Sequence, residues 1–343
     1  DGSFVIDDIT LNGDAICSGI LCTGVRVNGA GFSGNFQIEG TSTCGEDCYG
    51  VFFQPTAVNC VAPTQMQITG TATQCTSCFG AYLEAVNFDC EGDGQELQIL
   101  GNGKGGVYIT NTDGSMYNLS VNGTGSSSAG VFIDLSAQIK SAFAVYEGHS
   151  IGSHGLHFSG IDSDPFIPQS GCNIIWSGST QNDDSYPIEC PGINNLELQS
   201  CTLFIEDEIH ASGSFSTQTG GSTAESALYI EDGARIASAQ FAHRGDTHVL
   251  NGMDTDGNIR WEFASRKTFL CGDINGNYIE MVDTISRCLN GSELNISGGV
   301  SNIRAVAING DANFPTPVSL SAELIVLRDS VRNHVLVAVF LIS

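Results

Sequence analysis

An internal repeat runs through the first half of this chain. Its first part is a short alternating segment that ends in glycine, at positions 9–13, 36–40, 66–70, 97–101 and 119–123. Its second part begins with glycine and recurs at nearly regular intervals, at Gly24, Gly50, Gly80, Gly106, Gly130 and Gly155. These intervals of 24–30 residues are typical of solenoids, in which each repeat is one coil that lies on the next.

Both parts of the repeat alternate apolar and polar residues, which is the period of a strand with one buried face. A single coil cannot bury two such faces, whereas coils stacked about 4.8 Å apart bury a continuous core. The sequence therefore predicts an all-β fold, a parallel β-helix solenoid over residues 1–245. One inward stack is expected to hold Ile38, Ile68, Ile99 and Val121, and a second Val51, Ala81, Val107, Val131 and Leu156.

The glycines are expected to supply positive φ angles or close backbone approach at the corners of the coils. A β-sandwich is the alternative for residues 1–160, because it also contains many short alternating strands. Sandwich strands, however, do not repeat the same corner residue in each unit. The repeat thus favours the solenoid.

The pattern changes in the second half of the chain. Residues 162–200 contain four of the eight prolines and are interpreted as an insertion that covers one face. A weaker coil follows at residues 209–241. Residues 246–343 are interpreted as a smaller β-sandwich-like domain for capping and assembly, since an open terminal coil would expose a sheet edge.

Charge and hydropathy exclude several classes of partner. The chain has 12 Lys and Arg against 38 Asp and Glu, a net charge of −26, which repels phosphate and argues against nucleic-acid binding. The longest apolar run, at positions 335–342, is far shorter than the roughly 20 residues that cross a bilayer. We expect no nucleic-acid partner and no membrane span. A start without Met or a leader-like segment predicts a mature secreted chain.

The 13 cysteines follow the repeat, which predicts disulfides and an oxidising, extracellular location. Cys60 and Cys90 are separated by the same interval as Gly50 and Gly80, and equivalent positions on adjacent coils lie within the Cα range of a disulfide. Three pairs of cysteines recur just before coil glycines: Cys17 and Cys22, Cys44 and Cys48, and Cys75 and Cys78. A further pair, Cys271 and Cys288, flanks a strand near the C-terminus. Zinc held by the three pairs, or redox chemistry at residues 75–78, is the weaker alternative. Glycosylation triplets begin at Asn118, Asn122, Asn290 and Asn295.

The outward positions of the second strand form an aromatic row, with Phe52, Tyr82, Tyr108 and Phe132 followed by His157. Glutamines occupy the outward positions of the first strand, at Gln37, Gln67 and Gln98. An exposed aromatic stripe is rarely left in contact with water. We expect the insertion or C-terminal domain, a second subunit or a sugar to cover it.

Residues 9–160 resemble the β-helical coils of large secreted bacterial exoproteins and filamentous-haemagglutinin-like adhesins, which use similar Gly-apolar-x-apolar units. The resemblance implies a right-handed helix and a surface, adhesive or structural role. Residues 111–114 and 148–153 resemble fragments of the polygalacturonase pattern, which implies Asp113 and His149 as catalytic residues. The paired Asp residues between those fragments of the polygalacturonase pattern are absent here.

The sequence therefore predicts an extracellular structural or adhesive protein, not an enzyme, that assembles into a filament or surface oligomer. The alternatives are a polygalacturonase-like enzyme and a glycan-binding adhesin that does not polymerise. No metal site is expected, because the histidines at 149, 154 and 157 have no carboxylate at metal-like spacing. No cofactor is expected either, with calcium as the alternative because of the short Asp-containing turns at residues 254–257 and 273–276.

Overall fold

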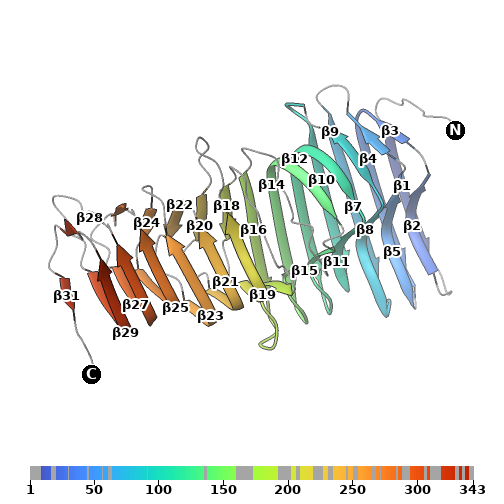
Figure 1. Ribbon diagram of the computed structural model, residues 1–343. Coiled ribbons are helices and arrows are strands. Elements are labelled where there is room, and N and C mark those ends of the chain that lie inside the picture. Colours follow the sequence, from blue (N-terminus) through green and yellow to red (C-terminus); the bar gives the residue numbers. More distant parts are fainter. Residues whose placement is uncertain are drawn as a thin grey trace. The chain divides into compact units, whose positions relative to one another are not determined.

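The computed structural model of the chain is built of β-strands (Figure 1). The structure describes residues 9–16, 21–29, 31–44, 46–55, 57–60, 64–90, 92–134, 137–159 and 173–191, and beyond these the backbone of further strands between residues 202 and 339. Two compact units are present, Asp1–Glu189 and Cys190–Ser343. Within the described ranges there is no helix, and so none that could span a membrane.

The strands of the first unit form a parallel β-solenoid of about six turns. One long sheet, the first sheet, contains β1 (Ile9–Ile16), β4 (Phe36–Thr43), β7 (Gln65–Thr73), β10 (Glu96–Gly103), β12 (Asp113–Gly125), β14 (Gln138–Ser150) and β16 (Asn173–Thr180). The second sheet contains β2 (Leu21–Asn28), β5 (Asp47–Gln54), β8 (Ser77–Glu84), β11 (Gly105–Thr110), β13 (Val131–Asp134), β15 (Leu156–Ser159) and β17 (Ile188–Pro191). Short strands complete the early coils: β3 (Gly31–Ser33), β6 (Ala57–Asn59) and β9 (Asn87–Cys90).

The strand register confirms both predicted inward stacks. Ile38, Ile68, Ile99 and Val121 are register partners on β4, β7, β10 and β12, and each is fully buried. Val51, Ala81, Val107, Val131 and Leu156 are equally buried partners in the second sheet. Because the pairing is parallel and in register, each apolar side chain packs on its equivalent one coil away.

Two columns of glycine bring the sheets into direct backbone contact. A Cβ added to Gly70 of the first sheet would lie 1.9 Å from the carbonyl oxygen of Gly80 in the second sheet, and one on Gly40 would lie 2.1 Å from that of Gly50. These glycines do not have a positive φ. Close approach, rather than an unusual backbone angle, therefore requires glycine here. We call this double column the glycine waist.

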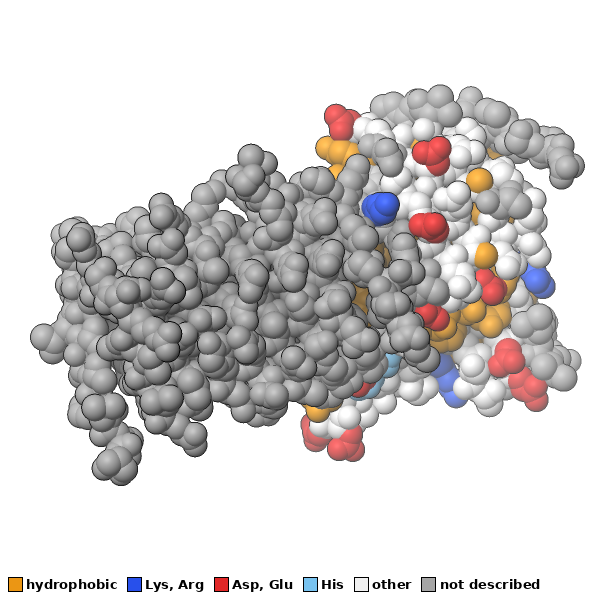
Figure 2. Space-filling view, viewed as in Figure 1, with side chains coloured by type: hydrophobic (Ala, Val, Ile, Leu, Met, Phe, Trp, Pro, Cys, Tyr) orange, Lys and Arg blue, Asp and Glu red, His pale blue; other side chains and the backbone are white. Residues whose placement is uncertain are grey.

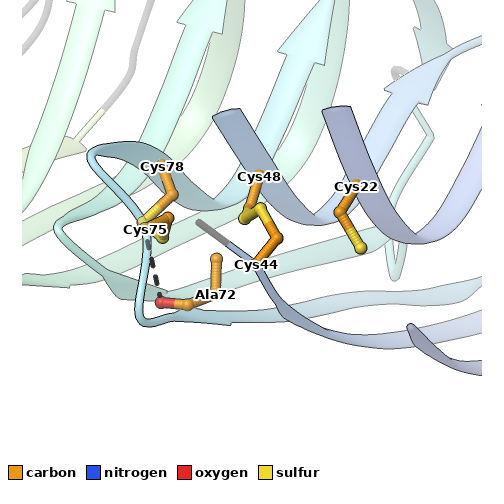
Figure 3. Close-up of a cluster of buried hydrophobic side chains, with 6 residues drawn as sticks. All are labelled: Cys22, Cys44, Cys48, Ala72, Cys75 and Cys78. Atoms are coloured by element: carbon orange, nitrogen blue, oxygen red, sulfur yellow. Dashed lines mark hydrogen bonds between the residues drawn. A yellow bond between two sulfur atoms is a disulfide. The ribbon is translucent and has the colours of Figure 1, made fainter. Parts of the chain in front are cut away.

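The glycine waist divides the interior of the early coils into two compartments. Along β4, Ile38 precedes the waist and Ser42 follows it, and both side chains are buried. The main core lies on the Ile38 side. The smaller side holds a cysteine compartment composed of Cys22, Cys44, Cys48, Ala72, Cys75 and Cys78 (Figure 3).

Disulfides occur in both compartments. Cys44 bonds to Cys48 and Cys75 to Cys78 in the cysteine compartment, where Cys22 is also disulfide-bonded. On the other side of the waist, Cys60 bonds to Cys90 of the next coil with a Cα separation of 4.8 Å, as the spacing predicted. Cys17, Cys271 and Cys288 lie outside the described residues.

Half of the predicted insertion is a regular coil. β16 pairs with β14 and β17 with β15, both in parallel. Pro187 occupies the coil position that precedes β17, and its carbonyl oxygen accepts a hydrogen bond of 2.8 Å from the Leu156 amide. Proline at the start of a strand leaves this ladder intact, so a high proline content was a misleading sign of an insertion. The remaining residues of 162–200 lie outside the described ranges.

The second unit also consists of parallel pairs. Its strands are β18 (Thr202–Ile205), β19 (Ile209–Gln218), β20 (Ala227–Ile230), β21 (Arg235–Arg244), β22 (Asp246–Val249), β23 (Asp254–Phe263), β24 (Thr268–Leu270), β25 (Gly272–Val282), β26 (Ile285–Arg287), β27 (Leu294–Arg304), β28 (Ala307–Asn309), β29 (Val318–Arg328), β30 (Arg332–Asn333) and β31 (Val337–Val339). Pairing joins every second strand along the chain, as in β25 with β27 and β27 with β29.

The strands within residues 246–343 therefore do not form the expected β-sandwich-like arrangement, which would require antiparallel sheets. Ile274, Ile296 and Leu320 are register partners on β25, β27 and β29, and their intervals along the chain are close to those between the coil glycines of the first unit. The coil period thus continues, although the Gly-apolar-x-apolar signature that marks the earlier coils has faded. A capping and assembly role for residues 246–343 stays a prediction.

Candidate functional site

Five rings form a continuous stack on the outer face of the second sheet, which we call the aromatic ladder. Neighbouring ring centroids are 4.7–5.3 Å apart and the ring planes lie within 12° of one another. The members are Phe52, Tyr82, Tyr108, Phe132 and His157. Parallel, in-register strands place equivalent side chains one strand spacing apart, and this spacing falls within the favourable range for offset ring stacking. The predicted row of outward rings is therefore present.

The aromatic ladder is broadened and capped by its neighbours. Tyr49 packs on Tyr82 at 4.9 Å and Phe79 on Tyr108 at 5.0 Å, both with tilted rings. The guanidinium carbon of Arg26 lies 5.0 Å from the Phe52 ring centre, a cation–π contact at one end of the ladder. All five ladder rings are partly buried. Figure 2 shows hydrophobic side chains at the surface of the described unit among acidic ones.

The stacking determines which part of each ring faces solvent. Three rings have a stacked neighbour on both of their faces: Tyr82, Tyr108 and Phe132. Edges and tyrosine hydroxyls are what remain for a partner. The aromatic ladder is thus a ribbed apolar strip, not a set of open platforms on which sugar rings can lie flat.

Burial and nearby carboxylates shape the electrostatics of the strip. Burial is the main cause of the raised pKa of Tyr82, and the charge of Glu84 adds to it. The pKa of Tyr108 is also raised, by burial and then by Asp134, and that of Tyr49 by burial and then by Asp47. An apolar strip with acidic margins results.

These raised pKa values predict a loss of stability at alkaline pH. Unfolded tyrosine ionises at a pKa of about 10, and the ladder tyrosines ionise later in the folded state. Above pH about 10 the unfolded state therefore binds fewer protons than the folded state, and the free energy of unfolding falls as pH rises. We expect alkaline unfolding to coincide with the rise in tyrosinate absorbance, and Tyr82→Phe to weaken the pH dependence of the midpoint. Tyr117→Phe, outside the ladder, is the control; equal effects of both substitutions would contradict the assignment.

A histidine cluster closes the far end of the aromatic ladder. His157 on β15 is the register partner of Glu189 on β17, and His154 precedes β15. The Nε2 atom of His154 contacts the Glu189 carboxylate, whose Oε2 atom is 3.4 Å from Nδ1 of His157. Burial lowers the pKa of His157, an effect that Glu189 opposes and His154 reinforces. The Tyr186 amide donates a hydrogen bond of 3.0 Å to Nδ1 of His154.

Sequence reasoning missed Glu189. Its interval from His157 along the chain is close to the coil period, but Glu189 falls in the segment whose prolines favour an insertion. Extending the period through that segment would have placed the carboxylate beside the two histidines.

The outer face of the first sheet carries amide and polar side chains. Gln67 donates to Gln98 across adjacent coils at 2.9 Å, as expected for a glutamine ladder. Further along, His149 lies 2.6 Å from the Ser179 hydroxyl and 2.9 Å from the Glu147 carboxylate. Asn122 donates to the other oxygen of Glu147 at 2.6 Å.

The structure does not bring together the two residues suggested by the polygalacturonase resemblance. Asp113 pairs with Gln138 at the beginning of β12 and β14, whereas His149 pairs with Thr124 near their ends. Most of the length of β14 separates the two levels. Glycoside hydrolysis requires two carboxyl groups within about 10 Å across one sugar bond, and this pair does not provide the acid and base for it.

The glycosylation candidates on the first sheet occupy outward positions. Asn118 and Asn122 are partly exposed and alternate with the buried Leu119 and Val121. Asn290, and the side chain of Asn295 on β27, lie outside the described part. The calcium alternative rested on residues 254–257 and 273–276, whose side chains are likewise not described.

Comparison with known proteins adds no relationship: no family model, no curated protein sequence and no solved structure matches this chain.

Proposed function

We propose that the protein is an extracellular structural or adhesive component that self-assembles into a filament or surface oligomer through its aromatic ladder. The ladder carries this proposal. It is a straight, partly exposed apolar strip of five rings on strands whose backbone groups are already paired with neighbouring coils. Association through the ladder must therefore use side chains.

The partner that fits this strip is a second copy of the chain. Two ladders share the same repeat along the coil axis, so the rings of one can pack against the edges of the other at every coil. A self-complementary contact of this kind is two-fold symmetric and closes on itself as a dimer, so a filament requires a second contact between such dimers. Sugar rings fit less well, because the ring faces in the ladder are covered.

Charge controls when such copies can meet. With a net charge of −26, two chains repel each other at low ionic strength, and salt or bound cations screen that repulsion. The apolar contact gains strength under the same conditions. Association is therefore expected to increase with salt, opposite to the behaviour of a contact between complementary charges.

The disulfides support a role outside the cell. Three are described in full, and Cys60–Cys90 joins successive coils. Such bonds persist in oxidising surroundings and limit the unfolded ensemble. Bonded coils suit a protein that must stay folded without cellular repair.

Sedimentation velocity of the full chain tests the proposal over a concentration series at low and high salt. The wild type is expected to associate more strongly at about 500 mM salt than at about 50 mM, because the Debye length falls from roughly 14 Å to roughly 4 Å over this range. Tyr82→Ala combined with Tyr108→Ala is expected to weaken association at least tenfold. Gln67→Ala with Gln98→Ala, on the outer face of the first sheet, is the matched control.

Two outcomes would overturn self-assembly through the ladder. One is a wild-type monomer at all concentrations and salt levels. The other is equal association of the ladder variant and the glutamine variant, with folding of both checked by circular dichroism. Glycan-array binding by a strictly monomeric wild type, lost in the ladder variant, would instead identify a non-polymerising adhesin.

A further inference from the structure

We propose that His154, His157 and Glu189 form a binding site for a divalent transition-metal ion of the zinc type. The proposal is independent of self-assembly. It rests on the histidine cluster, in which one ligand atom from each of these side chains lies within 4.8 Å of the other two.

The donor set is the one that zinc prefers at open sites. Two imidazole nitrogens and one carboxylate oxygen, with a water molecule in the fourth position, form a common zinc coordination sphere. Tetrahedral bonds of about 2.0–2.1 Å place ligand atoms roughly 3.3 Å apart. The 3.4 Å separation of His157 Nδ1 from Glu189 Oε2 already matches this value.

The solenoid holds the ligands in place from two successive coils. Parallel pairing of β15 with β17 sets His157 opposite Glu189. Just before these strands, the Gly155 amide donates to the Tyr186 carbonyl at 3.2 Å and the Leu156 amide to the Pro187 carbonyl at 2.8 Å. The ligand backbones are thus fixed before any ion arrives, which lowers the entropic cost of binding.

The environment suits an accessible ion. The side chains of His154, His157 and Glu189 are 19%, 18% and 17% exposed, which shields the charges partly while leaving one approach to water. Burial favours the neutral form of His157, whose nitrogen lone pair is then available. The acidic chain as a whole attracts cations.

Binding has one identifiable local cost. In the neutral His154 ring, Nδ1 accepts the Tyr186 amide, so the ring proton is on Nε2 and points to Glu189. When the ion binds Nε2, the proton moves to Nδ1 and the amide loses its acceptor. The Tyr186 ring lies parallel to that of His154, with centroids 6.1 Å apart. We therefore expect the backbone and ring of Tyr186 to shift when metal binds.

Zinc titration of the full chain, freed of metal with a chelator and with free thiols alkylated, tests the site. Calorimetry and elemental analysis are expected to show one strong zinc per chain, with a raised melting temperature. Cobalt(II) at the same site is expected to give visible bands of a tetrahedral nitrogen and oxygen environment. His157→Ala, Glu189→Gln and His154→Ala are each expected to weaken binding at least tenfold and to remove the thermal shift.

The other histidine–carboxylate pair supplies the control. His149→Ala with Glu147→Gln removes an exposed contact of 2.9 Å and should leave zinc binding unchanged. The proposal is overturned if millimolar zinc does not bind the wild type, or if this control loses binding as much as the cluster variants do. Should Glu189→Gln fail to fold, the cobalt spectrum of the wild type and the His154→Ala variant still decide the question.

Discussion

Gly70→Ala is expected to destabilise the first unit by at least about 4 kcal/mol, among the largest effects of a single added methyl group. The new Cβ would lie 1.9 Å from the oxygen and 2.4 Å from the carbonyl carbon of Gly80. Neither atom belongs to a flexible side chain. The two sheets would have to separate at the glycine waist, and this would strain the register partners Gly40 and Gly101 in adjacent coils. Urea unfolding followed by circular dichroism measures the loss.

Gly92→Ala is the matched control for this substitution. The nearest atom to its added Cβ is the Gln95 amide nitrogen at 3.1 Å, at the end of a side chain that can move. We expect a change within about 0.5 kcal/mol, as for an ordinary surface site. Gly29→Ala adds a second comparison, since it has open space around it but a φ of 71°. If Gly70→Ala and Gly92→Ala had similar effects, the sheets would not be in backbone contact.

Removal of the Cys60–Cys90 disulfide is expected to cost about 3–4 kcal/mol, from the entropy of the loop that it closes. The bond has a sequence separation of 30 and joins two coils, so the unfolded chain gains considerable freedom when it is lost. The double variant Cys60→Ala with Cys90→Ala avoids leaving an unpaired thiol. Chemical denaturation under non-reducing conditions measures the difference from the wild type.

The Cys44–Cys48 bond offers an internal comparison. Its sequence separation is only 4, and the same loop-entropy relation gives about 2 kcal/mol for Cys44→Ala with Cys48→Ala. The test is whether loss of the Cys60–Cys90 bond lowers the free energy of unfolding more than loss of the Cys44–Cys48 bond does. A larger loss from the short loop would show that packing within the cysteine compartment, rather than loop entropy, dominates.

Much of the first unit could be predicted from its period. Ile68 and Ala81 are buried, and Tyr82 is stacked, because one register relates equivalent residues in all coils. The role of the glycines was only half determined. Sequence alone left positive φ and close approach as alternatives, and the choice depends on the distance between two sheets, which no local pattern specifies.

The errors arose where the local signature weakened while the pairing continued. Prolines near Pro187 and the altered pattern after residue 245 concealed coils that the parallel ladders maintain. Glu189 was overlooked for the same reason. Asp113 and His149 were connected by family resemblance, and strand register places them at opposite ends of one strand pair. Long-range register, not residue type, decided each case.

The glycine waist also makes the coil modular. Because only backbone lies between the compartments, a side chain on one side can change without repacking the other side. The inward positions beyond the waist illustrate this freedom: Ser42 pairs with Ala72, and in later coils Gly125 pairs with Ser150, while the main core beside them stays apolar. Evolution can therefore gain or discard cysteine cross-links coil by coil and leave the rest of the scaffold untouched.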